Sequence, residues 1–254
     1  MPRNAAPITP LRLPRGMTHL VVFGGTFDPP HDYHAAEPAR VAERLFGKRA
    51  LVLYVPAARN PLKSKGPIAS DADRLTMLAL ATKDAPGRTA IWTDEIDRAV
   101  WSRERNTTSK PTAQQPSFMV DTLERLRRIT PKSVTLRLLV GGDAIASFHK
   151  WRRARRIIEL AEPLVMPRPG VNGSEVVGAL DVFDSLDLKF WTRAERAAWC
   201  TRLAPARIDD VSSTALRAAI ARAHADARHW RSDPMLRHLP EQVAKHIREH
   251  RLYS

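Results

Sequence analysis

The predicted fold follows first from one segment, Val21-Val22-Phe23-Gly24-Gly25-Thr26-Phe27-Asp28-Pro29-Pro30-His31-Asp32-Tyr33-His34. Its apolar start is typical of a buried strand, and its two glycines allow a tight turn at which a ligand can approach the backbone. The two prolines predict the first turn of a helix, where a missing N–H does no harm. His31 and His34 would then share one face of that helix. Because helix N-termini attract anions, the stretch predicts a phosphate site beside two imidazoles.

The rest of the chain predicts an α/β fold in which short apolar strands alternate with helices. We expect strands at 20–23, 51–55, 89–92, 136–140 and 164–166, and helices at 35–46, 71–81, 120–129, 151–160 and 193–203. This order implies right-handed βαβ crossovers, and therefore a doubly wound, mainly parallel sheet with helices on both faces and a small C-terminal helical part. The loops at the carboxyl ends of the strands should carry the ligand site.

A single domain over residues 18–254 is the organisation that the length of 254 residues favours. Residues 1–17 contain prolines and arginines without periodicity, so we expect a disordered N-terminal arm, with Met17 as an alternative start. Residues 99–116 are polar and of low complexity, which predicts an exposed insertion loop.

The composition bounds the partners of the protein. The formal charge of +14 favours anionic partners, a class that includes nucleotides, nucleic acid and acidic membrane surfaces. No apolar run is long enough to span a bilayer and no secretory signal is present, so we expect a cytoplasmic protein without a membrane partner. The single Cys200 excludes an intrachain disulfide and a cysteine-rich zinc site.

A second motif, Asp210-Val211-Ser212-Ser213-Thr214-Ala215-Leu216-Arg217, precedes an alanine-rich run. A serine-threonine cluster at this place is typical of a helix N-cap. If the helix begins near Ser212, Ser213 and Arg217 lie on one of its faces, where a hydroxyl, backbone N–H groups and a guanidinium could meet phosphate oxygens. A capped surface helix would give the same pattern.

The two motifs together resemble a known family. Gly24-Gly25-Thr26-Phe27-Asp28-Pro29-Pro30-His31 through His34 is similar to the signature of nucleotidyltransferases with a paired-histidine motif, and most of all to that of bacterial nicotinate-nucleotide adenylyltransferases. The second motif resembles the Ser-Ser-Thr-x-x-Arg motif with which this family binds ATP phosphates. The resemblance extends over residues 18–253.

This resemblance implies adenylyl transfer from ATP to nicotinate mononucleotide, which yields nicotinate adenine dinucleotide and pyrophosphate in NAD biosynthesis. ATP and the mononucleotide would be substrates, and Mg²⁺ would accompany ATP without a protein-built metal site. The catalytic residues would be His31, His34 and Arg217. The residues implied for ATP are Gly24, Gly25, Thr26, Phe27, Gly141, Asp143, Ser212, Ser213 and Thr214. Those implied for the mononucleotide are Lys63, Ser117, Phe118, Met119, Trp151 and Arg152.

Three loops carry the positions implied for the mononucleotide. Lys63 matches a lysine that faces substrate phosphate, and Trp151 matches a tryptophan that stacks on the pyridine ring. The segment 117–119 resembles a serine-aromatic-threonine loop whose backbone amides meet the nicotinate carboxylate, with Met119 where threonine is usual. Arg152 could pair with the same carboxylate. Asp28, the acid nearest the site, would orient the turn.

Two features keep alternatives open. Tyr33 stands where the family has glycine before its second histidine, so its ring could narrow the ATP pocket or stack on the adenine. A sister adenylyltransferase acting on nicotinamide mononucleotide or phosphopantetheine would share both phosphate motifs. A non-catalytic nucleotide- or nucleic-acid-binding protein on the same fold is a further alternative, although nucleic acid is not the partner we expect. A homo-oligomer is compatible with the sequence.

Overall fold

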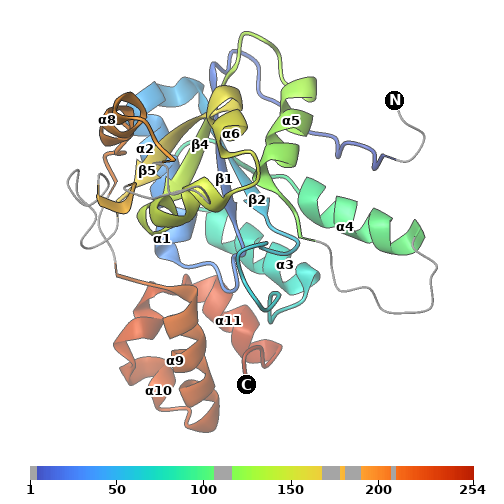
Figure 1. Cartoon of the computed structure of the whole chain (residues 1–254). Helices are drawn as coiled ribbons and strands as arrows, with labels where there is room; N and C mark the ends of the chain where they lie inside the picture. The colour runs from blue at the N-terminus through green and yellow to red at the C-terminus, as the bar shows by residue number, and fades with distance from the viewer. Residues whose placement is uncertain (1–4, 106–115, 168–177, 181–189, 207–209) are drawn as a thin grey trace.

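A parallel sheet of five strands forms the centre of the computed structural model, which describes residues 5–105, 116–167, 178–180, 190–206 and 210–254 (Figure 1). The strands are β1 (His19–Gly25), β2 (Ala50–Pro56), β3 (Thr89–Ile91), β4 (Thr135–Gly141) and β5 (Glu162–Met166). Their order is β3-β2-β1-β4-β5, and every neighbouring pair is parallel. The predicted α/β fold is confirmed. The strand order reverses between β1 and β4, so the crevice at their carboxyl ends is the expected ligand site.

Helices cover both faces of the sheet because β1 is apolar on both sides. Val21 and Phe23 belong to a core shared with α2 (Glu37–Phe46), α3 (Asp71–Thr82), α9 (Ser213–Ala225) and α11 (Glu241–Glu249). Leu20 and Val22 belong to a second core shared with α5 (Met119–Ile129), α6 (Ala154–Leu160) and α8 (Arg193–Cys200). The C-terminal helices α9, α10 (His229–Ser232) and α11 gather at one end of the molecule (Figure 1).

The remaining elements are the helices α1 (Asp32–Ala35) and α4 (Asp94–Arg105). Three 3-10 helices complete the described part of the chain, namely η1 (Gly47–Arg49), η2 (Gly142–Lys150) and η3 (Pro234–His238). The first motif thus runs from β1 through a turn into α1. The two prolines lie in the turn and not in the predicted first helical turn, because α1 begins only at Asp32.

Helix α4 corrects the expected loop at 99–116, because residues 99–105 are its last turns. Acidic residues fill its first turn and arginines its last, an arrangement that complements the helix dipole. Its Ile96 and Ala99 pack against Ala58. Residues 106–115 of the expected loop lie outside the described residues.

The N-terminal segment 5–17 also differs from the expected disordered arm. Ile8, Leu11 and Leu13 pack against the second core, and Met17 is buried. The Trp92 indole donates to the carbonyl of Thr9 at 3.0 Å. Apolar side chains can therefore anchor an extended segment even when their spacing is not that of a helix or a strand. A search for helical or strand spacing does not detect such a segment.

Because helices pack on both faces of the sheet, truncating a buried and an exposed leucine should lower the free energy of unfolding by different amounts. Leu78 of α3 is fully buried, whereas Leu45 of α2 is 40% exposed. Leu78→Ala should lower the free energy of unfolding by about 2–5 kcal/mol because it leaves a cavity. Leu45→Ala, the matched control, should change it by roughly 0.5 kcal/mol or little more. Urea unfolding measures both, and equal losses would contradict the packing of α3 on the sheet.

Candidate functional site

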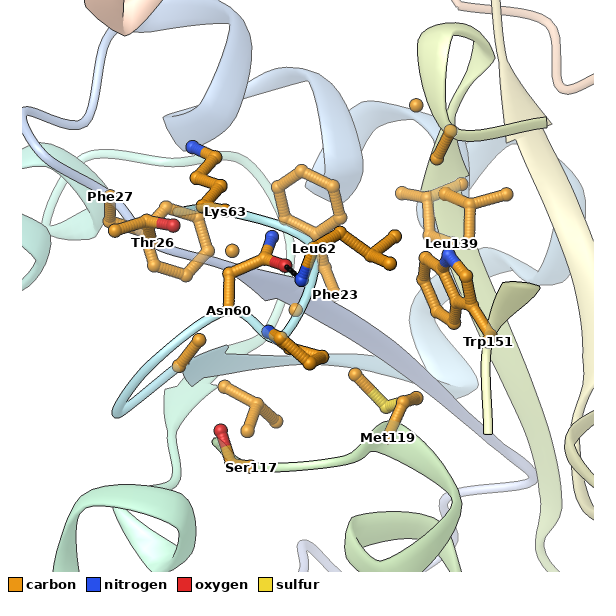
Figure 2. A pocket seen from close by; sticks show the side chains of 18 of the residues that line it. Phe23, Thr26, Phe27, Asn60, Leu62, Lys63, Ser117, Met119, Leu139 and Trp151 are labelled. Atoms are coloured by element: carbon orange, nitrogen blue, oxygen red, sulfur yellow. Dashed lines mark hydrogen bonds between the residues drawn. The ribbon is translucent and has the colours of Figure 1, made fainter. Parts of the chain in front are cut away.

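A cavity of about 420 Å³ lies at the carboxyl ends of β1, β2 and β4, where the fold predicts a ligand site (Figure 2). The first motif contributes Gly24, Gly25, Thr26, Phe27, Tyr33 and His34 to its wall. The wall also includes residues 60–63, 117–119 and 150–152, together with Gly141, Asp143, Ala144, Glu95, and Ser213 and Arg217 of α9. Most of the residues predicted for the site therefore line one space.

The two histidines of the first motif lie against each other. Their ring centroids are 3.7 Å apart, and the planes are nearly parallel at 23°. His34 lines the cavity, whereas His31 is fully buried and is the N-cap residue of α1. The rings of His34 and Phe27 are perpendicular, at 89°, with their centroids 5.6 Å apart. The stack restricts how the His34 ring can turn, so its imidazole is presented to the cavity in a fixed orientation.

Helix α9 places Arg217 on the same cavity. The Arg217 guanidinium donates to the carbonyl of Asp28 at 2.6 Å and to the hydroxyl of Thr214 at 3.1 Å. The Ser213 hydroxyl donates to the carbonyl of Pro29 at 2.9 Å. Ser212 caps the helix by accepting from the N–H of Ala215. Ser213 and Arg217 thus reach the cavity, while Ser212 shapes the helix start and Thr214 braces the arginine.

Asp28 connects this motif to the rest of the fold. Its buried carboxylate accepts the N–H groups of Ile68 at 2.8 Å and Ala69 at 3.1 Å. It also accepts the hydroxyl of Tyr253 at 2.7 Å. Burial, together with this carboxylate, raises the pKa of Tyr253. The sequence assigned Asp28 to orienting the turn but missed Tyr253, because no local pattern relates the two residues.

Two glycines of the wall lie close to neighbouring side chains. A Cβ at Gly24 would lie 2.5 Å from Cε of Met119, and a Cβ at Gly141 would lie 2.5 Å from Oδ1 of Asp143. A larger residue at either position would therefore displace the Met119 or the Asp143 side chain. The backbone of the first turn is held separately, because the carbonyl of Thr26 accepts from the fully buried Arg74 at 2.6 Å.

Lys63 and Trp151 lie on opposite sides of the cavity (Figure 2). Lys63 is exposed, and its loop is braced by Asn60, whose side-chain oxygen accepts from the N–H of Leu62 at 2.9 Å. The Trp151 ring stacks on Phe148, with centroids 4.8 Å apart. The space between them is therefore bounded by a cation and by an aromatic face.

The segment 117–119 forms the wall between these two residues. The Ser117 N–H donates to the carbonyl of Arg59 at 3.1 Å, so this amide is already used inside the protein. Arg152 lies over the Phe118 ring at 4.8 Å and reaches Asp121 at 3.7 Å, with about half of its side chain exposed. Met119 contacts the glycine turn of the first motif.

The sequence did not determine a role for two cavity residues, Tyr33 and Glu95. Tyr33 is 4% exposed, and its hydroxyl donates to the carbonyl of Pro167 at 2.5 Å, which ties its ring to the end of β5. Glu95 was missed altogether. It is buried beside Ser117 and Phe118, and burial raises the pKa of its carboxyl group. The acid-rich stretch 94–97 resembles a solvated helix start, so no sequence signal marked Glu95.

No group of three or more His, Cys, Asp or Glu side chains within the described ranges could hold a metal ion. Among the helices of these ranges, none combines the length and the apolar character needed to cross a membrane.

Known proteins are similar to this chain over most of its length. A sequence model of the cytidylyltransferase-like family matches residues 22–219. A probable nicotinate-nucleotide adenylyltransferase of Laribacter hongkongensis is 34% identical over 242 residues, which cover 91% of this chain and 93% of that protein. The corresponding protein of Chromobacterium violaceum is 32% identical over 241 residues, covering 91% and 97%.

Solved structures share the fold. The nicotinic acid mononucleotide adenylyltransferase of Plasmodium falciparum, complexed with NaAD, has a TM-score of 0.56 at 13% identity, over 93% of this chain and 97% of that chain. Its complex with APC has a TM-score of 0.52 at 12% identity, over the same shares. The family match and the full-length relatives show that this chain belongs to the cytidylyltransferase-like family and, within it, to the nicotinate-nucleotide adenylyltransferases.

Proposed function

We propose that the protein transfers the adenylyl group of ATP to nicotinate mononucleotide and releases pyrophosphate. The observation that carries this proposal is that His34 and Arg217, from two distant motifs, line one cavity. An imidazole and a guanidinium facing the same space suit a polyphosphate, whose oxygens need several donors and positive charge. The relatives named for this activity support the same acceptor.

In the proposed reaction, an oxygen of the mononucleotide 5′-phosphate attacks the α-phosphorus of ATP. The bond between the α-phosphorus and the oxygen that bridges it to the β-phosphorus breaks, and pyrophosphate leaves. Such a displacement needs positioning and charge stabilisation more than covalent catalysis. His34 would stabilise charge that develops on the α-phosphate. Its stack with the His31 ring would hold the His34 imidazole in place. Arg217 and Ser213 would bind the β- and γ-phosphates.

The acceptor would lie between Lys63 and Trp151, with its phosphate near the lysine and its pyridine ring against the indole. Base–aromatic stacking contributes about 1–3 kcal/mol per ring, which would help to orient a small substrate. Arg152, stacked on Phe118 at the wall, would add positive charge near the substrate carboxylate. Mg²⁺ would enter as part of the ATP complex, since it is usually bound through phosphates and few protein carboxylates.

An acceptor panel tests this assignment. With ATP and equal concentrations of nicotinate mononucleotide, nicotinamide mononucleotide or phosphopantetheine, pyrophosphate release should be fastest with the nicotinate compound. A faster reaction with another acceptor would reassign the protein to a sister activity. No pyrophosphate with any acceptor, together with steeply salt-dependent nucleic acid binding, would favour a binding protein.

The role of His34 predicts a loss of turnover without a loss of fold. His34→Ala should lower kcat by about 100- to 1000-fold, as the removal of a donor to a charged transition state does. His229→Ala is the matched control, because His229 lies on α10 and does not line the cavity. Steady-state kinetics measure kcat, and circular dichroism shows whether each variant keeps its fold. A kcat close to that of the control would remove His34 from the mechanism.

A further inference from the structure

Glu95 is a buried carboxyl group on the cavity wall for which the proposed reaction has no use. Its neighbour Asp94 forms ion pairs with Arg98 and Arg125. Glu95 instead accepts the hydroxyl groups of Ser117 and Thr122, the latter at 2.6 Å. Because a buried carboxylate without donors is costly, these two bonds are what the site provides for its charge.

The Thr122 hydroxyl also bonds to a third residue. The guanidinium of Arg98 donates to the Thr122 hydroxyl oxygen at 2.8 Å. The single proton of that hydroxyl has two acceptors in reach, Glu95 at 2.6 Å and the carbonyl of Phe118 at 3.3 Å, and Glu95 is the nearer one. Arg98, Thr122 and Glu95 are thus connected by a chain of hydrogen bonds. Burial and the nearby Asp94 raise the pKa of Glu95, while the two hydroxyls and Arg98 oppose that shift.

The two bonded hydroxyls flank the start of helix α5. Ser117 precedes the N-cap residue Phe118, and Thr122 lies in the first helical turn. Phe118 provides no side-chain cap, so the helix start lacks the usual means of fixing its geometry. Between the two hydroxyls, Phe118 and Met119 line the cavity. A carboxylate from α4 thus holds both ends of a turn that forms part of the substrate wall.

We propose that Glu95 is a positioning residue that fixes the first turn of α5, and with it the wall formed by Phe118 and Met119, on the acceptor side of the cavity. The assignment of this wall to the acceptor rests on the proposed function. The ATP-facing residues His34 and Arg217 are held by separate contacts with the first motif. Loss of Glu95 should therefore affect the acceptor more than ATP.

Kinetics of Glu95→Ala and Glu95→Gln test this role. Glu95→Ala should raise the KM for nicotinate mononucleotide about tenfold or more, while the KM for ATP stays within about twofold, since the ATP contacts are unchanged. Glu95→Gln keeps one acceptor oxygen and should restore part of the loss. Glu104→Ala, an exposed glutamate on the same helix, is the matched control and should change neither constant. Equal increases for both substrates would mean a merely structural role and would overturn the proposal.

Hydrogen exchange provides a readout that does not need activity. In Glu95→Ala, the amides of Asp121 and Thr122, which donate to the carbonyl of Phe118, should exchange at least about tenfold faster, while the hydrogen-bonded amides of α9 should keep their protection. If the unaltered protein releases no pyrophosphate, the proposed function fails, yet this exchange experiment still decides whether Glu95 holds the turn. Unchanged exchange at these two amides would overturn the positioning role whatever the kinetics.

Discussion

The buried oxygens of Asp28 are the constraint on which the arrangement of the site depends. Its carbonyl accepts the Arg217 guanidinium, and its carboxylate accepts the Tyr253 hydroxyl. The same carboxylate accepts the N–H groups of Ile68 and Ala69, which precede α3. One residue of the turn after β1 therefore joins the start of α3, the helix α9 and the C-terminal segment. This junction brings Arg217 to the cavity that His34 lines.

A second buried carboxyl group, that of Glu95, also lines the cavity. Asp28 and Glu95 are each 3% exposed, and both accept bonds from segments far away in the sequence. Burying charge without such donors would be unfavourable, so each carboxylate fixes the segments that satisfy it. Two parts of the cavity wall thus have separate supports. One part includes the motif after β1 and α9, and the other includes the start of α5.

The sequence predicted those parts of the fold and site that depend on local patterns. Apolar runs located the strands, and the Ser212 cap located the start of α9. The residues that the sequence missed act across long separations: Tyr253 on Asp28, and Glu95 on Ser117. Helix α4 was missed because its arginine-rich end resembles a loop, and the anchored segment 5–17 because its apolar residues have no period. The two motifs bring His34, Ser213 and Arg217 to one cavity because one motif lies at a strand end and the other at a helix start.

If His34 and Arg217 act on one triphosphate, their contributions to nucleotide binding depend on each other, and a double-mutant cycle measures that dependence. Calorimetric titration of a non-hydrolysable ATP analogue would compare the unaltered protein with His34→Ala, Arg217→Ala and the double variant. If both side chains hold the same polyphosphate, the two losses should couple by about 0.5–3 kcal/mol. Losses that add within about 0.5 kcal/mol, as they do for independent sites, would contradict the account.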